Sequence, residues 1–460
     1  MNALDLEAAA ARAVGRLVRV AGRGGGTSLP GLMLTRLAPD AIARLAVRLK
    51  RGSVAISATN GKTTTAAMAA AVLSRAGVRL VHNHAGANMA GGVAAALAQA
   101  ARPGGGIDGD MGLFELDELW LDRVVAQLRP RAILLGNLFR DQLDRYGELH
   151  AIAQRWEAAI AGPGAEARLV CNADDPLIAD LAREHPRATF YGVADPSVAL
   201  ERLPHAADSK HCRRCGAAYV YEAVHMGHLG VYHCPSCGRR RPEPSVQARG
   251  IRLDGTRAAA FSLHARGQSA EVSLRLPGLY NVYNALGAAA LCLELGVQLA
   301  DVADGLSAVD AAFGRSERVA IGGRELAILL VKNPAGANEV LRTLSLEPGP
   351  LSLLAALNDR VADGRDVSWI WDADFELLAG RAAHVVCSGT RAAELALRLK
   401  YAGVDERSLE VAPRLDQALE RALDSCTGTV YALPTYTALL ELRALLARGG
   451  HADRFWERRR

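Results

Sequence analysis

One loop has the residue types of a phosphate-binding site. In the run ATNGKTTT, which starts at Ala58, Gly61, Lys62 and Thr63 follow the apolar segment SVAISA and precede an alanine-rich stretch. A glycine turn at a helix N-terminus directs N–H groups at phosphate oxygens, a lysine neutralises the β- and γ-phosphates, and a hydroxyl ligates Mg²⁺. The generic pattern has a further glycine where Ile56 stands, so the match is partial. We expect a nucleotide site here, with an ordinary strand-to-helix turn as the alternative.

Four cysteines have metal-ligand spacing. Cys212 and Cys215 form one CxxC pair, and Cys234 and Cys237 form a second pair after eighteen intervening residues. Two such turns complete a tetrahedral Cys₄ site, which predicts Zn²⁺ in a structural role because four thiolates leave no open position. Paired disulfides are the alternative, which the lack of a signal peptide disfavours. Four nearby histidines are interpreted as surface or packing residues: His211, His225, His228 and His233.

An acidic cluster follows the apolar segment MGLF. Its first residue is Glu115, and Asp117 and Glu118 follow after Leu116. Carboxylates at the carboxyl edge of a parallel sheet are suitable ligands for the Mg²⁺ of a nucleotide. A charged helix start would look the same, so the cluster gains weight only from its place after the phosphate loop. We expect Glu115 and Thr63 to bind Mg²⁺.

The composition is that of a folded protein of two to four domains. Of 460 residues, 50% are hydrophobic, 22% are charged and 5% are aromatic, which excludes disorder as the main interpretation. The net charge of +5 is modest for this length, so charge alone does not indicate nucleic acid. We expect a cytoplasmic chain without a signal peptide or spanning helix, with at most peripheral contact at the inner face of the plasma membrane.

The elements that position these residues alternate between strands and helices. After an amphipathic helix at residues 3–21, apolar strands at 53–58, 131–135 and 168–171 alternate with helices such as 149–161, which predicts a parallel α/β sheet. An insert at about 205–241 carries the cysteines, and a strand-rich passage and a helix at 281–295 follow. Strands at 326–331, 351–357 and 384–389 predict a smaller doubly wound domain. The expected divisions are 1–50, a helix and linker; 51–312, an ATP-binding domain; and 313–460, a C-terminal domain.

Several motifs resemble those of the Mur ligase family, in the family's order. The loop resembles its GTxGKT sequence, residues 136–145 resemble TN…DHLDxH, residues 279–286 resemble HNVxNALAA near the adenine, residues 314–318 resemble GRxE, and residues 332–334 resemble HNP. The resemblance implies a central P-loop ATPase domain with an inserted Cys₄ zinc ribbon, followed by the C-terminal domain. It also implies ATP contacts and a catalytic lysine. The nucleotide contacts that it implies are Thr59, Asn60, Gly61, Lys62, Thr63, Thr64, Asn281 and Arg315, and the catalytic residues that it implies are Lys62, Glu115 and Lys332.

Departures from the family pattern indicate one branch of it. The ATP loop begins at residue 58, which leaves no room for a nucleotide-sugar domain. Gln142 stands where the family has a magnesium-binding histidine. No lysine lies between Lys62 and Lys210, where the family's carbamylated lysine would be expected. The ribbon and the loop 358–372 resemble the ligase subunit of a lipid II amidating complex. This implies amidation of the D-glutamate α-carboxylate of the lipid II stem peptide to D-isoglutamine through an acyl phosphate. Ammonia would come from a GatD-type glutaminase partner, because no cysteine here sits in a recognisable glutaminase motif.

The loop 358–372 carries several aspartates beside two tryptophans. The resemblance implies that one of them completes the Cys-His pair of the partner by orienting its histidine. We favour Asp372, with Asp366 as the second choice, and a solvated turn beside packing tryptophans is the alternative.

Three other functions compete with this interpretation. Folylpolyglutamate synthase also starts with its ATP domain, but the ribbon and the loop 358–372 argue against it. An NTP-dependent zinc-ribbon nucleic-acid-binding protein would use the patch at Arg239–Arg241, yet this class does not explain the ordered ligase motifs. A catalytically inactive scaffold that activates a glutaminase is the third possibility.

Overall fold

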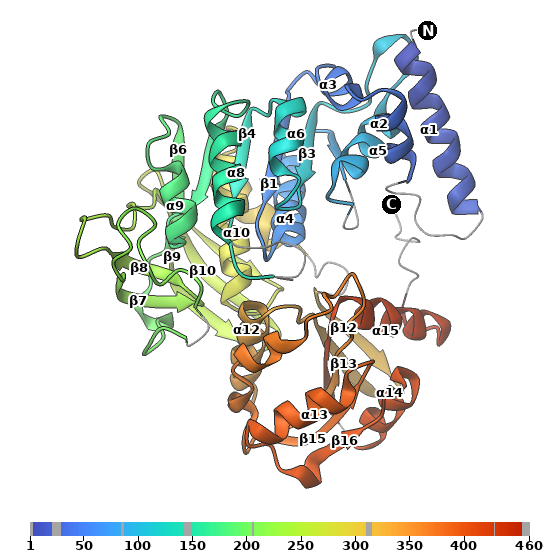
Figure 1. The fold of residues 1–460 in the computed structure, drawn as a ribbon, viewed down its shortest axis with the longest axis vertical. Coiled ribbons are helices and arrows are strands. Elements are labelled where there is room, and N and C mark those ends of the chain that lie inside the picture. Colours follow the sequence, from blue (N-terminus) through green and yellow to red (C-terminus); the bar gives the residue numbers. More distant parts are fainter. Residues whose placement is uncertain are drawn as a thin grey trace.

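The computed structural model describes residues 3–20, 29–83, 87–141, 149–204, 207–309, 315–426 and 428–452, and of residues 3, 16–20 and 315 it describes the backbone alone. The chain forms two α/β parts, one around a nine-stranded sheet and one around a six-stranded sheet. Figure 1 shows the six-stranded part below the nine-stranded part.

The larger sheet has the order β11-β10-β9-β6-β5-β4-β1-β3-β2. The strands from β2 to β6 in this order are parallel, β9 pairs in parallel with β6, and β9, β10 and β11 form an antiparallel meander. The predicted parallel α/β sheet is confirmed. The bounds are β1 Ser53–Ser57, β2 Leu80–His82, β3 Met111–Glu115, β4 Ala132–Leu135, β5 Arg168–Asn172, β6 Ala188–Val193, β9 Val246–Asp254, β10 Ala258–Ala265 and β11 Gln268–Leu274.

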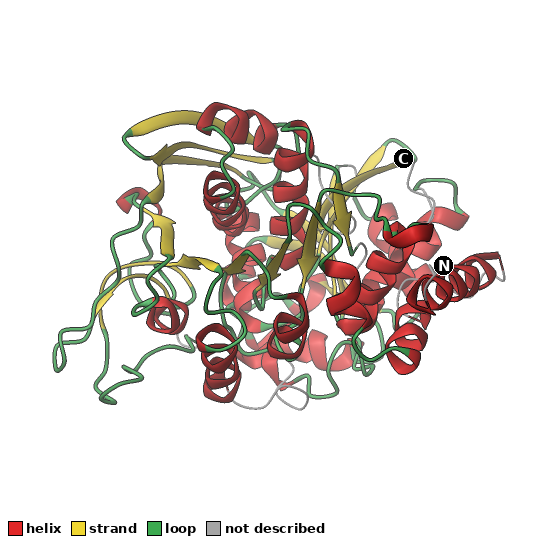
Figure 2. Cartoon of the chain, turned by 90° about the horizontal axis from the view of Figure 1, so that it is seen from above, coloured by secondary structure: helices red, strands yellow, loops and turns green. Residues whose placement is uncertain are grey.

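Helices cover both faces of this sheet, as the view from above shows (Figure 2). Because side chains alternate along a strand, Val54 and Ile56 of β1 pack into one core while Ala55 packs into the other. The first core includes α4 Lys62–Arg75, α10 Leu279–Glu294 and α11 Leu299–Ser307. The second includes α5 Ala90–Ala100, α6 Leu121–Leu128, α8 Leu149–Ala161 and α9 Pro176–Ala182.

Three N-terminal helices join the second core. The predicted helix at 3–21 is α1 Ala3–Val20, whereas α2 Leu29–Leu37 and α3 Ala41–Ala46 lie in the stretch expected to be a linker. Leu34 and Ile42 are fully buried in the same core as Phe114. Helix α2 lies very close to α5, since a Cβ added at Gly31 would meet the carbonyl oxygen of Gly91 at 1.6 Å.

The cysteine-bearing insert leaves the sheet after β6 and returns at β9. It contains the antiparallel hairpin β7 Val220–Met226 and β8 Leu229–His233, and Figure 1 shows this hairpin beside β6 and β9 at the edge of the molecule.

The C-terminal sheet has the order β12-β13-β17-β14-β15-β16, in which only the β12–β13 pair is antiparallel. Helices α12 and α13 share a core with one face, and α14 and α15 with the other, so the predicted smaller doubly wound domain is confirmed. Its bounds are β12 Arg315–Ile321, β13 Arg324–Leu329, α12 Pro334–Ser345, β14 Leu351–Ala356, α13 Ala392–Tyr401, β15 Ala382–Ser388, β16 Leu409–Val411, α14 Leu415–Asp424, β17 Thr429–Pro434 and α15 Tyr436–Arg448.

Short 3₁₀ helices complete the structure. They are η1 Pro103–Gly105, η2 Pro196–Val198, η3 Ser368–Asp372, η4 Phe375–Leu378 and η5 Glu406–Ser408. Among the helices described, none has both the length and the apolar character that crossing a bilayer requires.

Candidate functional site

The loop between β1 and α4 is held in a conformation that requires glycine. Gly61, the residue before α4, has φ of +83°, and a Cβ at this position would meet Oδ1 of Asn284 at 1.9 Å. Asn284 lies in α10, so the loop runs directly against the helix that the HNVxNALAA-like motif forms. Both the backbone angle and the close approach therefore exclude a side chain at Gly61.

Lys62 is buried in an ion pair. Its Nζ donates to Oε2 of Glu118 at 2.7 Å and to the carbonyl oxygen of Ala58 at 2.5 Å, and the residue is 7% exposed. Burial alone would lower the pKa of Lys62, but the attraction of Glu118, Asp117 and Glu115 raises it above its usual value. Burial likewise opposes ionisation of Glu118, yet Lys62 and Lys332 hold the pKa of Glu118 below its usual value. Lys62 is therefore a fixed cation at the start of α4.

Thr63 and Glu115 meet beside this pair. The Thr63 hydroxyl donates to Oε1 of Glu115 at 2.9 Å. The parallel register that sets Ile56 opposite Glu115 places this carboxylate level with the end of β1. A hydroxyl and a carboxylate are hard oxygen donors of the kind that Mg²⁺ prefers, so these two residues fit the predicted magnesium site.

The other loop residues are fixed by contacts with two different elements. Thr59 exchanges hydrogen bonds with the backbone of Phe139, its Oγ1 accepting at 3.1 Å and donating at 3.3 Å. The side chain of Asn60 forms a reciprocal amide pair with Asn333 of the C-terminal part, at 3.2 and 3.1 Å. Thr64 is buried. The loop is thus held by both parts of the chain.

A cavity of about 320 Å³, the main cavity, opens in front of the loop. Its wall includes Asn281, where the resemblance implied an adenine contact, and the side chain of Asn281 is fixed by Pro277 and Asn284. Arg315 begins β12, but its side chain lies outside the described part of the chain. The lining comes from both parts and includes Thr59, Asn60, Gly61, Lys62, Thr63, Thr64, Glu115, Asp141, Met226, Tyr280, Asn281, Asn284, Lys332 and Glu339.

Lys332 reaches from the C-terminal part to the loop. Its Nζ donates to the carbonyl oxygen of Thr59 at 3.3 Å and forms an ion pair with Asp141. Burial raises the pKa of the Asp141 carboxyl, an effect that the attraction of Lys332 only partly offsets. The next residue, Gln142, lies outside the described residues.

A second cavity of about 50 Å³ lies behind Lys332. Both aspartates proposed for the partner's triad line it. Asp372 is paired with Arg140 at 3.3 Å, and Oδ1 of Asp366 accepts from the backbone N–H of Ser368 at 2.9 Å. The structure therefore brings Asp366, Asp372 and Lys332 together in the wall of one cavity.

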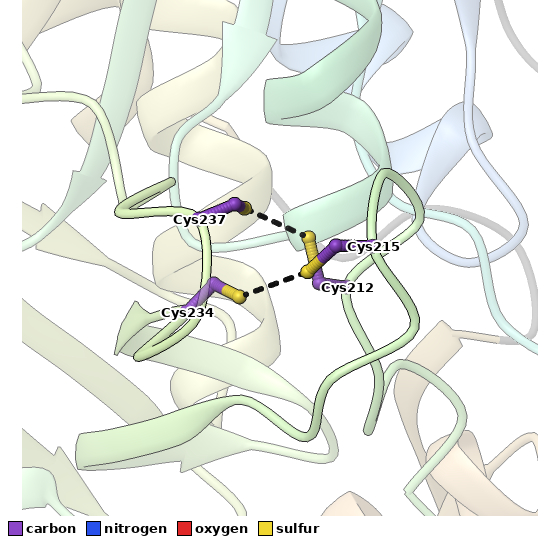
Figure 3. A group of neighbouring side chains, drawn as sticks. All are labelled: Cys212, Cys215, Cys234 and Cys237. Atoms are coloured by element: carbon purple, nitrogen blue, oxygen red, sulfur yellow. Dashed lines mark hydrogen bonds between the residues drawn. The ribbon is translucent and has the colours of Figure 1, made fainter.

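The four predicted cysteines form one cluster (Figure 3). Their sulfur atoms all lie within 4.8 Å of one another, with Cys212 and Cys237 at 3.6 Å and Cys215 and Cys234 at 3.4 Å. Zn–S bonds of about 2.3 Å in a tetrahedron place sulfur atoms about 3.8 Å apart, whereas a disulfide needs about 2.05 Å. The cluster fits a metal ion better than the alternative pair of disulfides.

The hairpin between the two cysteine pairs also contacts the main cavity. Met226 lines it, and Nδ1 of the buried His225 lies 3.2 Å from the hydroxyl of Tyr283, another lining residue. The ring of His228, at the turn, packs on Phe139, with centroids 4.6 Å apart. His225 and His228 are thus packing residues that join the ribbon to the site.

Several residues at the site belong to the predicted motifs, but the sequence alone predicts no individual role for them. Glu118, Asn137, Asp141, Asn284 and Asn333 hold the loop or line the cavities. Their membership of these motifs is the one signal in the sequence that they belong to the site, because the residues that they contact lie far away in the sequence.

The phosphate loop, the acidic residues at the end of β3 and the second α/β domain over the cavity define the Mur ligase class. Residues 56–234 match the family model of the Mur ligase middle domain, and residues 330–439 match that of the MurT ligase C-terminal domain. The fold is similar to that of a pseudomurein peptide ligase type C from Methanothermus fervidus, with a TM-score of 0.67 and 22% identity over 87% of this chain and 79% of that one. MurF from Acinetobacter baumannii has a TM-score of 0.65 and 19% identity, over 90% and 80%.

Two named relatives that are similar to this chain belong to one family of Mur ligases. The chain is 32% identical, over 95% of both chains, to a Staphylococcus aureus protein named lipid II isoglutaminyl synthase (glutamine-hydrolyzing) subunit MurT. It is also 32% identical to the protein of that name from Streptococcus pneumoniae, over 92% of this chain and 93% of the relative. The chain belongs to the MurT family of Mur ligases. A match over nearly the whole length favours this family over folylpolyglutamate synthase and over a nucleic-acid-binding protein.

Replacing Lys62 by methionine is expected to destabilise the fold as well as the site. Removal of one partner from a buried ion pair typically costs about 3–5 kcal/mol, because Glu118 stays buried without its cation. The double variant Lys62→Met with Glu118→Gln should recover most of this loss. Urea unfolding of the three proteins measures it. Lys400→Met, which breaks an exposed pair with Glu406, is the control and should cost less than about 1 kcal/mol. Equal stability of Lys62→Met and the unmodified chain would show that the pair contributes nothing.

Proposed function

We propose that the chain catalyses ATP-dependent amidation of the D-glutamate α-carboxylate of the lipid II stem peptide, giving D-isoglutamine in peptidoglycan biosynthesis. The observation that carries this proposal is the match, over 95% of both chains, to a relative named as a lipid II isoglutaminyl synthase subunit. The loop, the main cavity and the acidic residues around Thr63 support it, because they suit a nucleoside triphosphate and its Mg²⁺.

The proposed reaction has two steps. The substrate carboxylate attacks the γ-phosphorus of ATP, so that an acyl phosphate forms and ADP leaves. The nitrogen of ammonia then attacks the acyl carbon, phosphate leaves, and the attacking nitrogen loses one proton to give the amide. Phosphoryl transfer of this kind depends on positioning and charge neutralisation more than on covalent chemistry by the protein.

Each site residue has a role in this scheme. The N–H groups at the start of α4 and the ammonium of Lys62 bind the phosphates, and Asn60, Thr64, Asn281 and Arg315 complete the nucleotide site. Thr63 and Glu115 hold Mg²⁺, which supplies charge neutralisation when bound. Lys332 would stabilise charge on the transferred phosphoryl group, a role that its contact with Thr59 of the loop supports.

The proposal predicts turnover with ammonium salts. The purified chain with Mg²⁺, ATP, lipid II and ammonium chloride should release ADP and give a lipid product lighter by the difference between OH and NH₂ in mass spectrometry. Lys62→Arg, which keeps the charge but not the compact ammonium, should lose at least about tenfold in rate. No ADP and no mass change, even after a glutaminase is added, would refute the lipid II substrate, and folate with glutamate would be tested next.

We propose that the cysteine cluster binds one structural Zn²⁺. Its spacing and its sulfur geometry support the assignment, and the thiolates leave no position for substrate. Because the hairpin lines the main cavity through Met226, zinc binding should stabilise the nucleotide site as well as the ribbon.

Zinc analysis of the purified chain is expected to give one equivalent, and Cys234→Ser should lose it. The same variant should unfold at a lower temperature and bind an ATP analogue several-fold more weakly, measured by calorimetry. Cys426→Ser is the matched control, since Cys426 lies outside the cluster. A Cys234→Ser protein with a full equivalent of zinc would contradict the assignment.

We propose that the C-terminal domain docks a GatD-type glutaminase that supplies the ammonia. The relatives are named as one subunit of a glutamine-hydrolyzing synthase, which supports a partner subunit. Beside Asp372, Trp371 is 51% exposed and Tyr401 is 70% exposed, with ring centroids 5.9 Å apart. Exposed aromatic side chains of this kind are enriched at the energetic centres of interfaces.

In this complex Asp372 would orient the partner's catalytic histidine. Asp372→Asn is expected to lower glutamine hydrolysis by at least about tenfold, because the amide would favour the wrong histidine tautomer. Release of glutamate by the complex is the measurement, with Asp366→Asn tested beside it as the second choice. Asp374→Asn, whose side chain pairs with Arg342, is the control. Unchanged hydrolysis in Asp372→Asn, with loss in Asp366→Asn, would transfer the role to Asp366.

We also propose the division of the chain into residues 1–50, 51–312 and 313–460, with the ribbon at about 205–241, and a cytoplasmic location with at most peripheral contact at the inner face of the plasma membrane. The first of these segments packs on the central domain, because α1, α2 and α3 share a core with the larger sheet.

A further inference from the structure

Residues 137–139, the support segment, lie directly against the phosphate loop. Oδ1 of Asn137 accepts from the N–H of Asn60 at 2.9 Å, and its Nδ2 donates to the carbonyl oxygen of Asn60 at 3.0 Å. The N–H of Thr59 donates to the carbonyl oxygen of Asn137 at 2.9 Å, and the backbone of Phe139 exchanges two hydrogen bonds with the Thr59 hydroxyl. The position of the support segment therefore sets the position of the loop.

Thr59 in turn contacts both lysines of the site. Its carbonyl oxygen accepts from Nζ of Lys62 at 3.4 Å and from Nζ of Lys332 at 3.3 Å. In the proposed reaction these two ammonium groups neutralise the phosphates, and such stabilisation depends on accurate placement of the charges. A displacement of Thr59 would therefore move both cations.

The turn of the hairpin β7–β8 packs on the side chain of the support segment. Gly227 in this turn has φ of +58°, and a Cβ added there would meet Cε1 of Phe139 at 2.9 Å. The ring of His228 packs on the same ring, with centroids 4.6 Å apart. Phe139 is 2% exposed, so its ring has little room to move away. The hairpin turn thus fixes the Phe139 side chain.

A buried carboxylate joins the turn and the segment at a second point. Oδ2 of Asp175 accepts from the N–H of Leu138 at 2.9 Å and lies 3.3 Å from Nε2 of His228. Asp175 and His228 are both fully buried. Because a buried carboxylate is costly unless polar groups surround it, this contact resists separation of the turn from the segment.

We propose that the turn of the ribbon hairpin is a positioning element for phosphoryl transfer. It fixes the ring of Phe139, and the backbone of Phe139 fixes Thr59. Thr59 then sets the ammonium groups of Lys62 and Lys332. This inference rests on the proposed function, and it gives the inserted ribbon a part in placing the charges that ATP meets.

The test replaces the turn glycine in the full-length chain. Gly227→Ala introduces a Cβ against Phe139, and its affinity for an ATP analogue in calorimetry is expected to fall about tenfold, because the loop is displaced. Gly250→Ala is the matched control: Gly250 also has φ of +58°, but no atom of the described residues lies within 4 Å of a Cβ there. It should bind the analogue within about twofold of the unmodified chain. Both variants should keep the zinc content of the unmodified chain.

A second substitution separates the contact from strain in the hairpin. Phe139→Leu removes the ring atom that the new Cβ would meet, so the double variant Gly227→Ala with Phe139→Leu should bind the analogue within about twofold of Phe139→Leu alone. Backbone strain confined to the turn would not be relieved by a change at Phe139. If Gly227→Ala does not fold, recovery of a folded, analogue-binding protein in the double variant supports the inference.

Kinetics with ammonium chloride and lipid II give a further readout. In Gly227→Ala the KM for ATP should rise about tenfold and kcat should fall, while the KM for lipid II stays unchanged, because the turn acts through the loop. A general loss of structure would change both KM values.

Three results decide between the possible failures. Equal affinity of Gly227→Ala and Gly250→Ala for the analogue would overturn the inference, and so would a double variant that binds no better than Gly227→Ala. Failure of the unmodified chain to bind the analogue would instead overturn the proposed function.

Discussion

The need of a buried lysine for a carboxylate determines how the site is built. Lys62 lies where the sheet, α4 and the loop exclude water, and an ammonium in such a place is tolerated only beside an anion. Glu118 supplies that anion from the segment after β3, so β3 must lie beside β1 in the register that sets Ile56 opposite Glu115. The same register delivers Glu115 to Thr63. One electrostatic requirement thus joins the strand order of the larger sheet to the geometry of the loop.

The second domain is tied to this loop by polar contacts and not by a continuous apolar core. The buried cores of the two sheets are separate, although Ala335 of α12 packs against the first core of the larger sheet. The pairs Asn60–Asn333, Lys332–Asp141 and Arg140–Asp372 join the two domains. Contacts of this type are directional and exchange readily with water or ligand, so they set an orientation without locking it. The main cavity lies where these contacts join the two domains, so both domains contribute residues to its lining.

Much of the fold could be predicted because its strands are continuous apolar runs and its motifs lie at their ends. The parallel sheet, α10 and the doubly wound C-terminal unit follow from such local signals. Helices α2 and α3 could not be predicted in this way: α2 is short and apolar around most of its circumference, and its place depends on the contact of Gly31 with Gly91. The partner of Asn60 lies 273 residues away, and the contact of Gly227 with Phe139 is a property of packing. Pairings of this kind leave no periodicity in a single sequence.

The position of the ribbon between β6 and β9 has a consequence for how the chain reaches its folded state. These strands are neighbours in the sheet, Tyr191 lying opposite Val246, yet the whole insert separates them in the sequence. Bringing the two strands together means closing that long segment, which is entropically costly and slow. A metal ion held by the four thiolates would fold the insert into a compact unit and so shorten the loop that must close before the strands meet, since such sites form together with their fold. The supply of metal during synthesis would then govern how much enzyme a cell obtains from each chain that it makes.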